Sequence, residues 1–259
     1  MHWFKIRSFI AFLLVSKNRH GVHSPFVYNL VDKCFNAKTN LSKMNSFKSI
    51  QKSIYSNHEN IAITDYGKGS SVFKNNNRKV SNIAKIAGIS TKRAKLLLRI
   101  IDYFKPINML EIGTSVGLGT SVLSVGNPGA KIITLEGCEN TAEVAKELFK
   151  THKLNNIDLI VGNFNETLSS AIKNKQFDLI YFDGNHQKKA TLQYFNQCLE
   201  TAHNDSIFIF DDINWSIEMK EAWEEIKNHP KITVTVNIFY WGIVFFRREQ
   251  EKQHFTIRV

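Results

Sequence analysis

The stretch Glu111-Ile112-Gly113-Thr114-Ser115-Val116-Gly117-Leu118-Gly119-Thr120 joins the end of an apolar run to the start of a helical pattern. Its glycines allow a tight turn and let a ligand approach the main-chain N–H groups. Glu136 closes the next apolar run, 23 residues after Gly113. A carboxylate at that place can accept both hydrogen bonds of a ribose diol. The pattern therefore predicts a strand, a turn and a helix that bind a ligand containing ribose.

Five short apolar runs around this stretch predict buried parallel strands. They are residues 107–112, 131–136, 157–161, 177–183 and 206–211. Helical patterns occupy residues 140–151, 188–201 and 216–228. Strands that alternate with helices imply right-handed crossovers and a parallel sheet.

The end of the chain breaks this alternation. Residues 232–238 alternate apolar and polar side chains, and Trp241 and Gly242 lead directly into an apolar run at 243–246. No helix fits between the two runs, so they are expected to pair as an antiparallel hairpin. The predicted fold class is therefore α/β, with a seven-stranded, mostly parallel sheet, a C-terminal antiparallel hairpin and a helical N-terminal extension.

Two of the predicted helices carry further signals. Asn140 and Glu143 have the spacing of a helix N-cap and the third residue of that helix. In the helix at 216–228, four apolar residues recur at helical spacing and are expected to face the core: Met219, Ala222, Trp223 and Ile226.

Residues 1–105 show no convincing strand pattern, and helical spacing predicts helices at 41–57, 81–88 and 90–104. The apolar run at 9–15 is assigned to an amphipathic N-terminal helix, because Lys17 and Arg19 follow it without a signal-peptide cleavage pattern. The Gly-rich segment 65–71 is predicted to be a loop in which Tyr66 and Ser70 form a flap over a ligand. We expect a helical cover at 1–104 and a ligand-binding domain at 105–259.

Charge separates the same two segments. Residues 1–105 contain 19 of the 34 Lys and Arg but 4 of the 23 Asp and Glu, a balance of +15, whereas the rest of the chain carries −4. Clustered cations attract phosphates, which keeps RNA open as a partner, although a solvated helical surface is the simpler interpretation.

The apolar runs and the cysteines indicate where in the cell the protein is expected. The longest apolar run has seven residues, too few for a transmembrane segment. Cys34, Cys138 and Cys198 are far apart and show no zinc-binding spacing. Reduced thiols fit a cytoplasmic location best.

These motifs resemble those of the class I S-adenosylmethionine-dependent methyltransferases, whose sheet is Rossmann-like. Residues 111–120 are similar to their first motif, and Glu136 matches the acidic residue that holds the ribose. Gly162-Asn163-Phe164 resembles the loop that contacts adenine, although many members have Asp where Asn163 stands. The resemblance covers about residues 105–248 and implies S-adenosylmethionine as the cofactor. The residues expected to contact it are Tyr66, Ser70, Glu111, Gly113, Thr114, Ser115, Gly117, Glu136, Gly137, Asn163, Phe164 and Asp183.

A nicotinamide cofactor is the competing interpretation, because short-chain dehydrogenases share this glycine spacing. Those enzymes need a Tyr-x-x-x-Lys pair to protonate the carbonyl. No tyrosine of this chain has a lysine four residues later, so the sequence favours S-adenosylmethionine.

Two polar segments follow the fourth and fifth strands, Asp183-Gly184-Asn185-His186 and Asp211-Asp212-Ile213-Asn214-Trp215. If the two strands are neighbours, their carboxyl ends bring three carboxylates to one edge of the sheet. Such a cluster repels itself unless a cation or protons intervene, and oxygen ligands without cysteine suit Mg²⁺.

Within the superfamily, the chain is most similar to the O-methyltransferases. In the metal-dependent ones an Asp, a second Asp and an Asn hold Mg²⁺. Asp183 and Asp211 match the first two ligands, and Asp212 replaces the Asn. The alternative is that Asp183 serves the cofactor or the reaction alone, while Asp211 or Asp212 caps the following turn.

Methyl transfer requires alignment of the reactants and removal of a proton from the acceptor. Asp183 and His186 are the predicted catalytic residues, with His186 as the base because imidazole changes charge near neutral pH. We expect O-methylation of a small hydroxylated molecule. RNA methylation through the basic segment, and cofactor binding without catalysis, are the alternatives. The sequence does not identify the acceptor.

Overall fold

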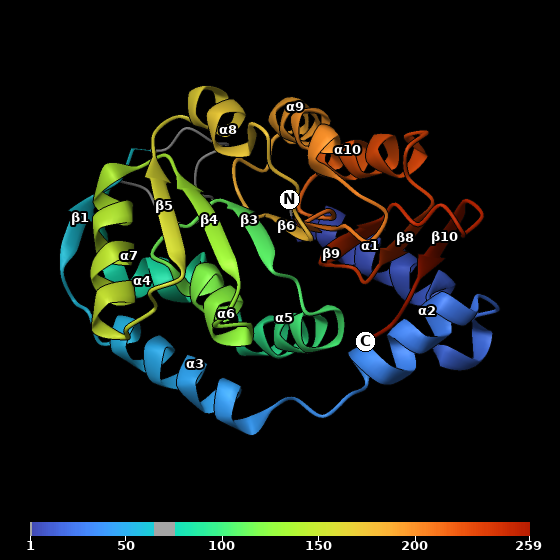
Figure 1. Ribbon diagram of the computed structural model, residues 1–259, viewed down its shortest axis with the longest axis horizontal. Helices are drawn as coiled ribbons and strands as arrows, with labels where there is room; N and C mark the ends of the chain where they lie inside the picture. Colours follow the sequence, from blue (N-terminus) through green and yellow to red (C-terminus); the bar gives the residue numbers. More distant parts are fainter. Residues whose placement is uncertain (1, 65–75) are drawn as a thin grey trace. The chain divides into compact units, whose positions relative to one another are not determined.

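The computed structural model describes residues 2–64 and 76–259, without the side chains of His2 and His20 (Figure 1). The chain divides into two compact units. One consists of Met1–Asn36 and Asn174–Val259, and the other of Ala37–Lys173. The roles expected for residues 1–104 and 105–259, a cover and a ligand-binding domain, remain a prediction.

The unit Ala37–Lys173 contains three parallel strands of the main sheet, in the order β3-β4-β5. Its strands are β1 (Asn60–Ala62), β2 (Asn77–Lys79), β3 (Asn108–Ile112), β4 (Lys131–Glu136) and β5 (Ile157–Val161). Its helices are α3 (Leu41–Tyr55), α4 (Val80–Ile86), α5 (Thr91–Phe104), α6 (Leu118–Gly126), α7 (Glu139–Thr151) and α8 (Phe164–Ile172). α6, α7 and α8 pack against β4, and α7 and α8 also pack against β5 (Figure 1).

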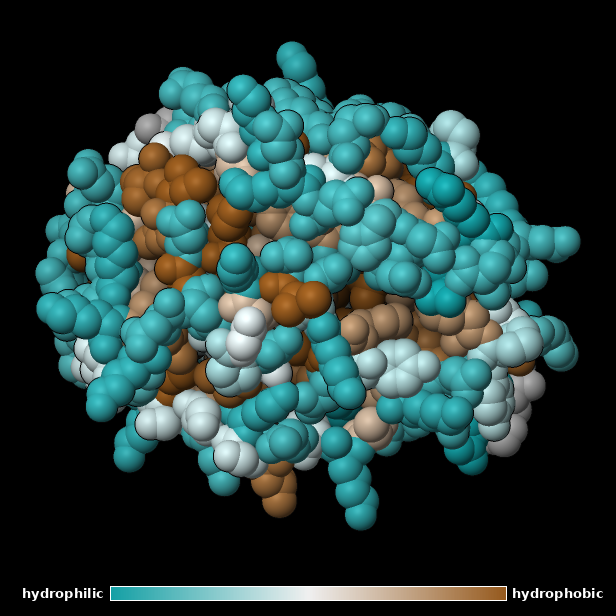
Figure 2. All heavy atoms as spheres, viewed as in Figure 1, coloured by the Kyte–Doolittle hydropathy of each residue, from teal (hydrophilic) through white to brown (hydrophobic). Residues whose placement is uncertain are grey.

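The sequence pattern located these strands closely. β4 and β5 have the predicted bounds, and β3 begins one residue later than predicted. β5 is an end strand of the main sheet, and its side chains are half-buried or exposed. In Figure 2, hydrophobic side chains come to the surface in the left half of the view, where Figure 1 draws β5.

The prediction that residues 1–105 contain no strand is wrong. β1 and β2 form an antiparallel pair in which Asn60 lies opposite Lys79 and Ala62 opposite Asn77. Each strand has three residues, and Ile61 is the one buried side chain among these six. Strands this short and this exposed do not produce the apolar alternation that identifies a strand in a sequence.

The predicted cap at Asn140 is also wrong. α7 begins at Glu139, and its N-cap residue is Cys138. The side-chain amide of Asn140 instead donates a hydrogen bond of 2.7 Å to the carbonyl oxygen of Ala62. The side chain of Asn140, which local spacing assigned to the helix end, is thus used in a contact with a residue 78 positions away.

The unit formed by Met1–Asn36 and Asn174–Val259 contains five strands of the main sheet, in the order β6-β7-β9-β8-β10. They are β6 (Leu179–Phe182), β7 (Ile207–Asp211), β8 (Val234–Asn237), β9 (Trp241–Phe245) and β10 (Gln253–Thr256). The helices are α1 (His2–Val15), α2 (Pro25–Asn29), α9 (Lys188–Cys198) and α10 (Ile217–Asn228), with the shorter helical segments η1 (Arg19–Gly21), η2 (Leu30–Phe35) and η3 (Leu199–Thr201).

The pairing of these strands confirms the predicted hairpin. β6 and β7 are parallel, whereas β9 runs antiparallel to both β7 and β8. β10 then pairs in parallel with β8, so the mostly parallel main sheet has eight strands rather than the predicted seven. The residues of β10 are exposed or half-buried, so the sequence shows no apolar pattern that would predict this strand.

The core of this unit confirms the helical stripe predicted for 216–228. All four predicted residues of α10 are buried. The ring of Trp223 lies so close to the backbone of β9 that a Cβ atom on Gly242 would stand 2.3 Å from it. Only glycine permits this approach, which explains the interruption of the apolar run at that position.

The N-terminal helix is confirmed, but most of its exposed side chains are apolar. Ser8 and Phe12 are buried, while Trp3 is 79% exposed and Leu14 is 82% exposed. Within residues 2–64 and 76–259, no helix has both the length and the apolar character needed to cross a membrane.

Candidate active site

The turn after β3 is fixed by hydrogen bonds to the neighbouring strand. The backbone N–H groups of Gly113 and Thr114 both donate to the carbonyl oxygen of Leu135 in β4, each at 3.0 Å. Gly117 then caps α6 with φ +88, and a Cβ atom there would stand 2.7 Å from the ring of Phe149. Both the backbone angle and the close ring select glycine at this position.

Glu136, at the end of β4, points toward this turn. One oxygen of its carboxylate accepts from the backbone N–H of Ser115 at 2.6 Å, and the other accepts from the N–H of Cys138 at 2.9 Å. Burial raises the pKa of Glu136, and the hydrogen bonds from Cys138 and Ser115 oppose that rise. Hydrogen bonds from the side chain of Thr141 and the backbone of Gly137 also lower this pKa, so the carboxylate is a buried acceptor surrounded by donors.

Glu111 lies beneath the same turn and is fully buried. Its Oε2 accepts from the hydroxyl of Thr134 at 2.6 Å and from the hydroxyl of Thr120. Burial raises its pKa to about 7, against these two hydrogen bonds and with a smaller upward contribution from the charge of Glu136. Its Oε1 is buried and has no hydrogen-bond partner among the described residues.

The third predicted cofactor segment follows β5. Gly162 has φ +143, and Asn163 caps α8 by accepting from the N–H of Asn165 at 3.0 Å. The amide oxygen of Asn163 therefore has a structural partner and one lone pair left for a ligand. Phe164 is half-buried and begins α8. Tyr66 and Ser70, the predicted flap residues, lie outside the described residues.

The loop after β6, in the other unit, brings Asp183 and His186 together. Asp183 Oδ1 lies 3.7 Å from His186 Nε2, with side chains that are 17% and 29% exposed. Asn185 and His186 both have positive φ, +65 and +25. Such backbone angles cost free energy and are concentrated at functional sites. The side-chain amide of Asn185 donates to the hydroxyl of Tyr194 at 3.2 Å.

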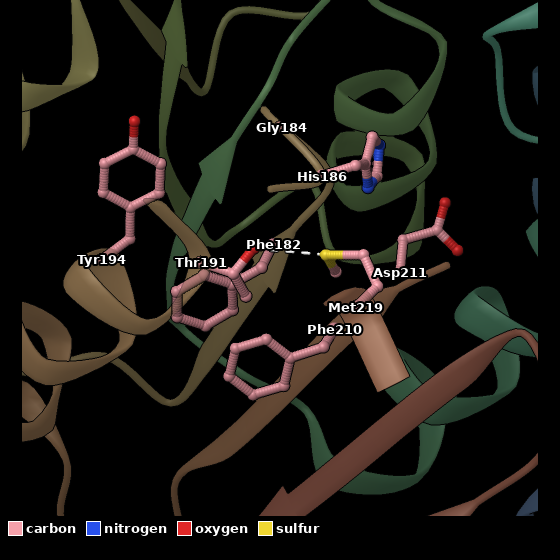
Figure 3. Close-up of a pocket in the computed structure, with 8 residues that line it drawn as sticks. All are labelled: Phe182, Gly184, His186, Thr191, Tyr194, Phe210, Asp211 and Met219. Atoms are coloured by element: carbon pink, nitrogen blue, oxygen red, sulfur yellow. Dashed lines mark hydrogen bonds between the residues drawn. The ribbon is translucent and has the colours of Figure 1, made fainter. Parts of the chain in front are cut away.

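A small pocket opens beside this loop (Figure 3). The rings of Phe182 and Phe210 stack on one side of it, with centroids 4.2 Å apart. The hydroxyl of Thr191 contacts the sulfur of Met219 at 3.6 Å. The pocket is lined by Phe182, Gly184, His186, Thr191, Tyr194, Phe210, Asp211 and Met219. It thus combines apolar walls with the two polar groups most suited to proton transfer, the imidazole of His186 and the carboxylate of Asp211.

The carboxylates do not fit the predicted magnesium site. β6 and β7 are neighbours, as that prediction required, and Asp211 is buried at the end of β7. Asp183, Asp211 and Asp212 nevertheless do not form a metal-holding group, and no three His, Cys, Asp or Glu residues do so within 2–64 and 76–259. The backbone of Asp212 is left-handed, with φ +52. Neighbouring strand ends fix the positions of the backbone but not the directions of the side chains.

Residues 110–213 match the family described as "Methyltransferase domain". This part of the chain is similar to the methyltransferase domains of that family. The match confirms the resemblance that the motifs at 111–120 and at Glu136 indicated. No curated protein sequence matches the chain.

Solved structures share the fold of the methyltransferase domain and most of the remaining chain. A methyltransferase of Podospora anserina, PaMTH1, bound to SAH, is 16% identical, with a TM-score of 0.60 over 87% of this chain and 97% of that one. An O-methyltransferase of Bacillus cereus in complex with SAH is 19% identical, with a TM-score of 0.55 over 85% and 97%. A putative caffeoyl-CoA O-methyltransferase of Staphylococcus aureus is 17% identical, with a TM-score of 0.56 over 80% and 100%.

Sequence reasoning missed several contributors to the methyltransferase domain. Thr134 and Thr120 donate hydrogen bonds to Oε2 of Glu111, and Tyr194 and Thr191 line the pocket. Thr134 is the one polar residue inside the apolar run 132–135, and this was the signal that could have identified it. The two residues of α9 gave no such signal, because polar side chains are ordinary on a helix.

Proposed function

We propose that the chain is an S-adenosylmethionine-dependent methyltransferase that transfers a methyl group to the hydroxyl of a small molecule. The orientation of Glu136 carries this proposal, because the backbone N–H of Ser115 holds its carboxylate at the glycine turn. A carboxylate fixed at the ends of parallel strands is suited to a ribose diol. The matched methyltransferase domain and the SAH-bound structures of the same fold support the choice of cofactor.

The residues around the turn fit such a cofactor. Glu136 would hold the ribose hydroxyls, and the segment Gly162-Asn163-Phe164 would contact the adenine. The unpaired Oε1 of Glu111 is a buried acceptor without a partner among the described residues, as expected where a ligand or a water completes the site. When bound, the cofactor supplies a methyl group on a sulfonium that is ready to leave.

The residues of the chain supply proton removal and exclusion of water. His186 accepts the proton of the acceptor hydroxyl, and Asp183, 3.7 Å away, stabilises the imidazolium that forms. The oxygen–methyl bond forms as the carbon–sulfur bond breaks, so the products are a methyl ether and S-adenosylhomocysteine. Phe182 and Phe210 exclude water from one wall of the pocket. We propose that this route works without a metal ion, since the carboxylates do not form a metal-holding group.

The test is production of S-adenosylhomocysteine from S-adenosylmethionine with a panel of aromatic and aliphatic hydroxyl compounds. We expect turnover with at least one hydroxylated acceptor, and a methyl ether as its product by mass spectrometry. Cofactor binding without turnover on any acceptor, and without any effect of Asp183→Ala on binding, would instead identify a cofactor-binding protein without catalysis. If RNA were the one acceptor that is methylated, the protein would be an RNA methyltransferase rather than an enzyme for small molecules.

A further inference from the structure

We propose that α1 is an interfacial helix that docks the protein on an anionic lipid surface. Most of the exposed side chains of α1 are large and apolar. They recur at spacings of three and four and are exposed by 37% to 82%: Trp3, Ile6, Ile10, Leu13 and Leu14. We call these five residues the outer face of α1.

The opposite side of α1 is fixed to its own unit. The ring of Phe12 packs against the ring of Phe239, with centroids 5.5 Å apart, and Lys5 Nζ lies 3.1 Å from the ring centre of Trp215. At the end of the helix, the N–H of Lys17 donates to the carbonyl oxygen of Thr256, and the N–H of Arg258 donates to that of Lys17. The outer face is therefore held in place by the fold and does not depend on a flexible tail.

The length of α1 and the charge of the N-terminal segment indicate which partner binds the outer face. Fourteen helical residues extend about 21 Å, less than the roughly 30 Å of a bilayer core, so α1 can lie on a membrane but not cross it. The first acidic residue of the chain is Asp32, which is paired with Arg19 at 2.9 Å, and the remaining cations before it are Lys5, Arg7 and Lys17. Arg7 and Lys17 are exposed. Large apolar side chains with an interfacial Trp and flanking cations are the combination that anionic lipid surfaces bind.

Two other occupants fit less well. RNA binds mainly to clustered cations through its phosphates, and a face made of Trp, Ile and Leu provides no such contacts. A second copy of the chain in a twofold dimer would place the same basic segment, with Arg7 and Lys17, on both sides of the interface, and that segment contains no acidic residue before Asp32 to compensate. Docking on lipid would also bring the loop that contains Trp215 close to the membrane, because Lys5 of α1 lies on that ring.

The experiment is flotation of the full chain with vesicles of phosphatidylcholine alone and of phosphatidylcholine mixed with phosphatidylglycerol. The test variant is Trp3→Ser/Ile10→Ser/Leu14→Ser. The control variant, Leu41→Ser/Ile86→Ser/Ile217→Ser, removes three exposed apolar side chains elsewhere. A third variant, Arg7→Gln/Lys17→Gln, removes charge alone. Thermal unfolding and calorimetric titration with S-adenosylmethionine verify that each variant is folded.

We expect the wild type to float with the mixed vesicles and the control variant to match it. The test variant should lose about a hundredfold in partitioning, because each large apolar side chain that leaves water contributes about tenfold and burial at an interface is partial. The charge variant should lose about tenfold at low salt. The cofactor titration is independent of vesicle binding, so failure of this proposal is distinguishable from failure of the proposed function.

Three results would overturn the proposal. One is the absence of flotation of the wild type with either kind of vesicle. Another is equal partitioning of the wild type and the test variant, or of both vesicle compositions. The third is a wild-type dimer in light scattering that the test variant converts to a monomer, which would assign the outer face to a second copy.

Discussion

The carboxylate of Glu136 accepts a hydrogen bond of 2.6 Å from the backbone N–H of Ser115. This bond links the end of β4 to the glycine turn after β3, so the acidic group and the turn cannot move independently. Ser115 has φ +50, a left-handed backbone that turns its N–H toward the carboxylate side of the turn. This hydrogen bond contributes to preorganisation of the site proposed for the cofactor, and preorganisation lowers the entropic cost of binding.

Replacement of Gly117 by alanine should destabilise the fold. An alanine at φ +88 is strained, and its Cβ would stand 2.7 Å from the ring of Phe149. We expect a loss of about 2 kcal/mol or more in the free energy of unfolding, measured by urea denaturation. Gly129→Ala is the control, because the nearest atom to its Cβ would be 3.6 Å away. Equal stability of the two variants would contradict the proposed constraint.

Glu111 should make the stability of the protein depend on pH. Its pKa is raised from 4.5 to about 7 in the fold, so the folded chain retains a proton that the unfolded chain has lost. The free energy of unfolding should therefore fall as the pH rises from 4.5 to about 7, by on the order of 3 kcal/mol, and level off above that range.

The variant Glu111→Gln tests this contribution, because an amide of nearly the same shape does not titrate. We expect its free energy of unfolding to change less over the same pH range in chemical denaturation. Glu143→Gln, on the exposed face of α7, should keep the wild-type slope. If the free energy of unfolding of Glu111→Gln changed with pH as much as that of the wild type, another group would be responsible for the pH dependence.

His186→Gln should lower kcat without changing the affinity for S-adenosylmethionine. Loss of a general base costs about a hundredfold or more. His203→Gln is a matched control, because His203 also faces a carboxylate, Asp178 Oδ1 at 3.0 Å, and is similarly exposed. Loss of activity in both variants, or in neither, would remove His186 from the proposed role.

Removal of divalent metal should leave activity unchanged. Asp183, Asp211 and Asp212 do not form a group that holds a metal ion. We therefore expect equal initial rates with EDTA and with added Mg²⁺. A rate that EDTA abolishes and Mg²⁺ restores would return these carboxylates to the role that the resemblance to metal-dependent O-methyltransferases implied.

The sequence predicted the parts of this molecule that local patterns encode. Buried parallel strands are continuous apolar runs, so β4 and β5 were predicted with their correct bounds, and the spacing from Gly113 placed Glu136 at the end of β4. β1, β2 and β10 were missed, because strands of three or four mostly exposed or half-buried residues carry no periodic signal.

Interactions between distant residues could not be predicted in the same way. Thr134 supports Glu111 because the parallel register places them side by side, and no local pattern contains that register. The amide of Asn140 is engaged by Ala62, 78 residues away, rather than by its own helix. The magnesium prediction depended on β6 lying beside β7, and that condition is met, but the three carboxylates do not form a metal-holding group.

Calorimetric titration with S-adenosylmethionine tests the central proposal most directly, with wild type, Glu136→Gln and the control Glu143→Gln. We predict that the wild type and the control bind S-adenosylmethionine and S-adenosylhomocysteine but not NAD. Glu136→Gln should bind at least about tenfold more weakly, because charged hydrogen bonds to the ribose are lost. Uptake of NAD in place of S-adenosylmethionine, or unchanged affinity in Glu136→Gln, would contradict the proposal.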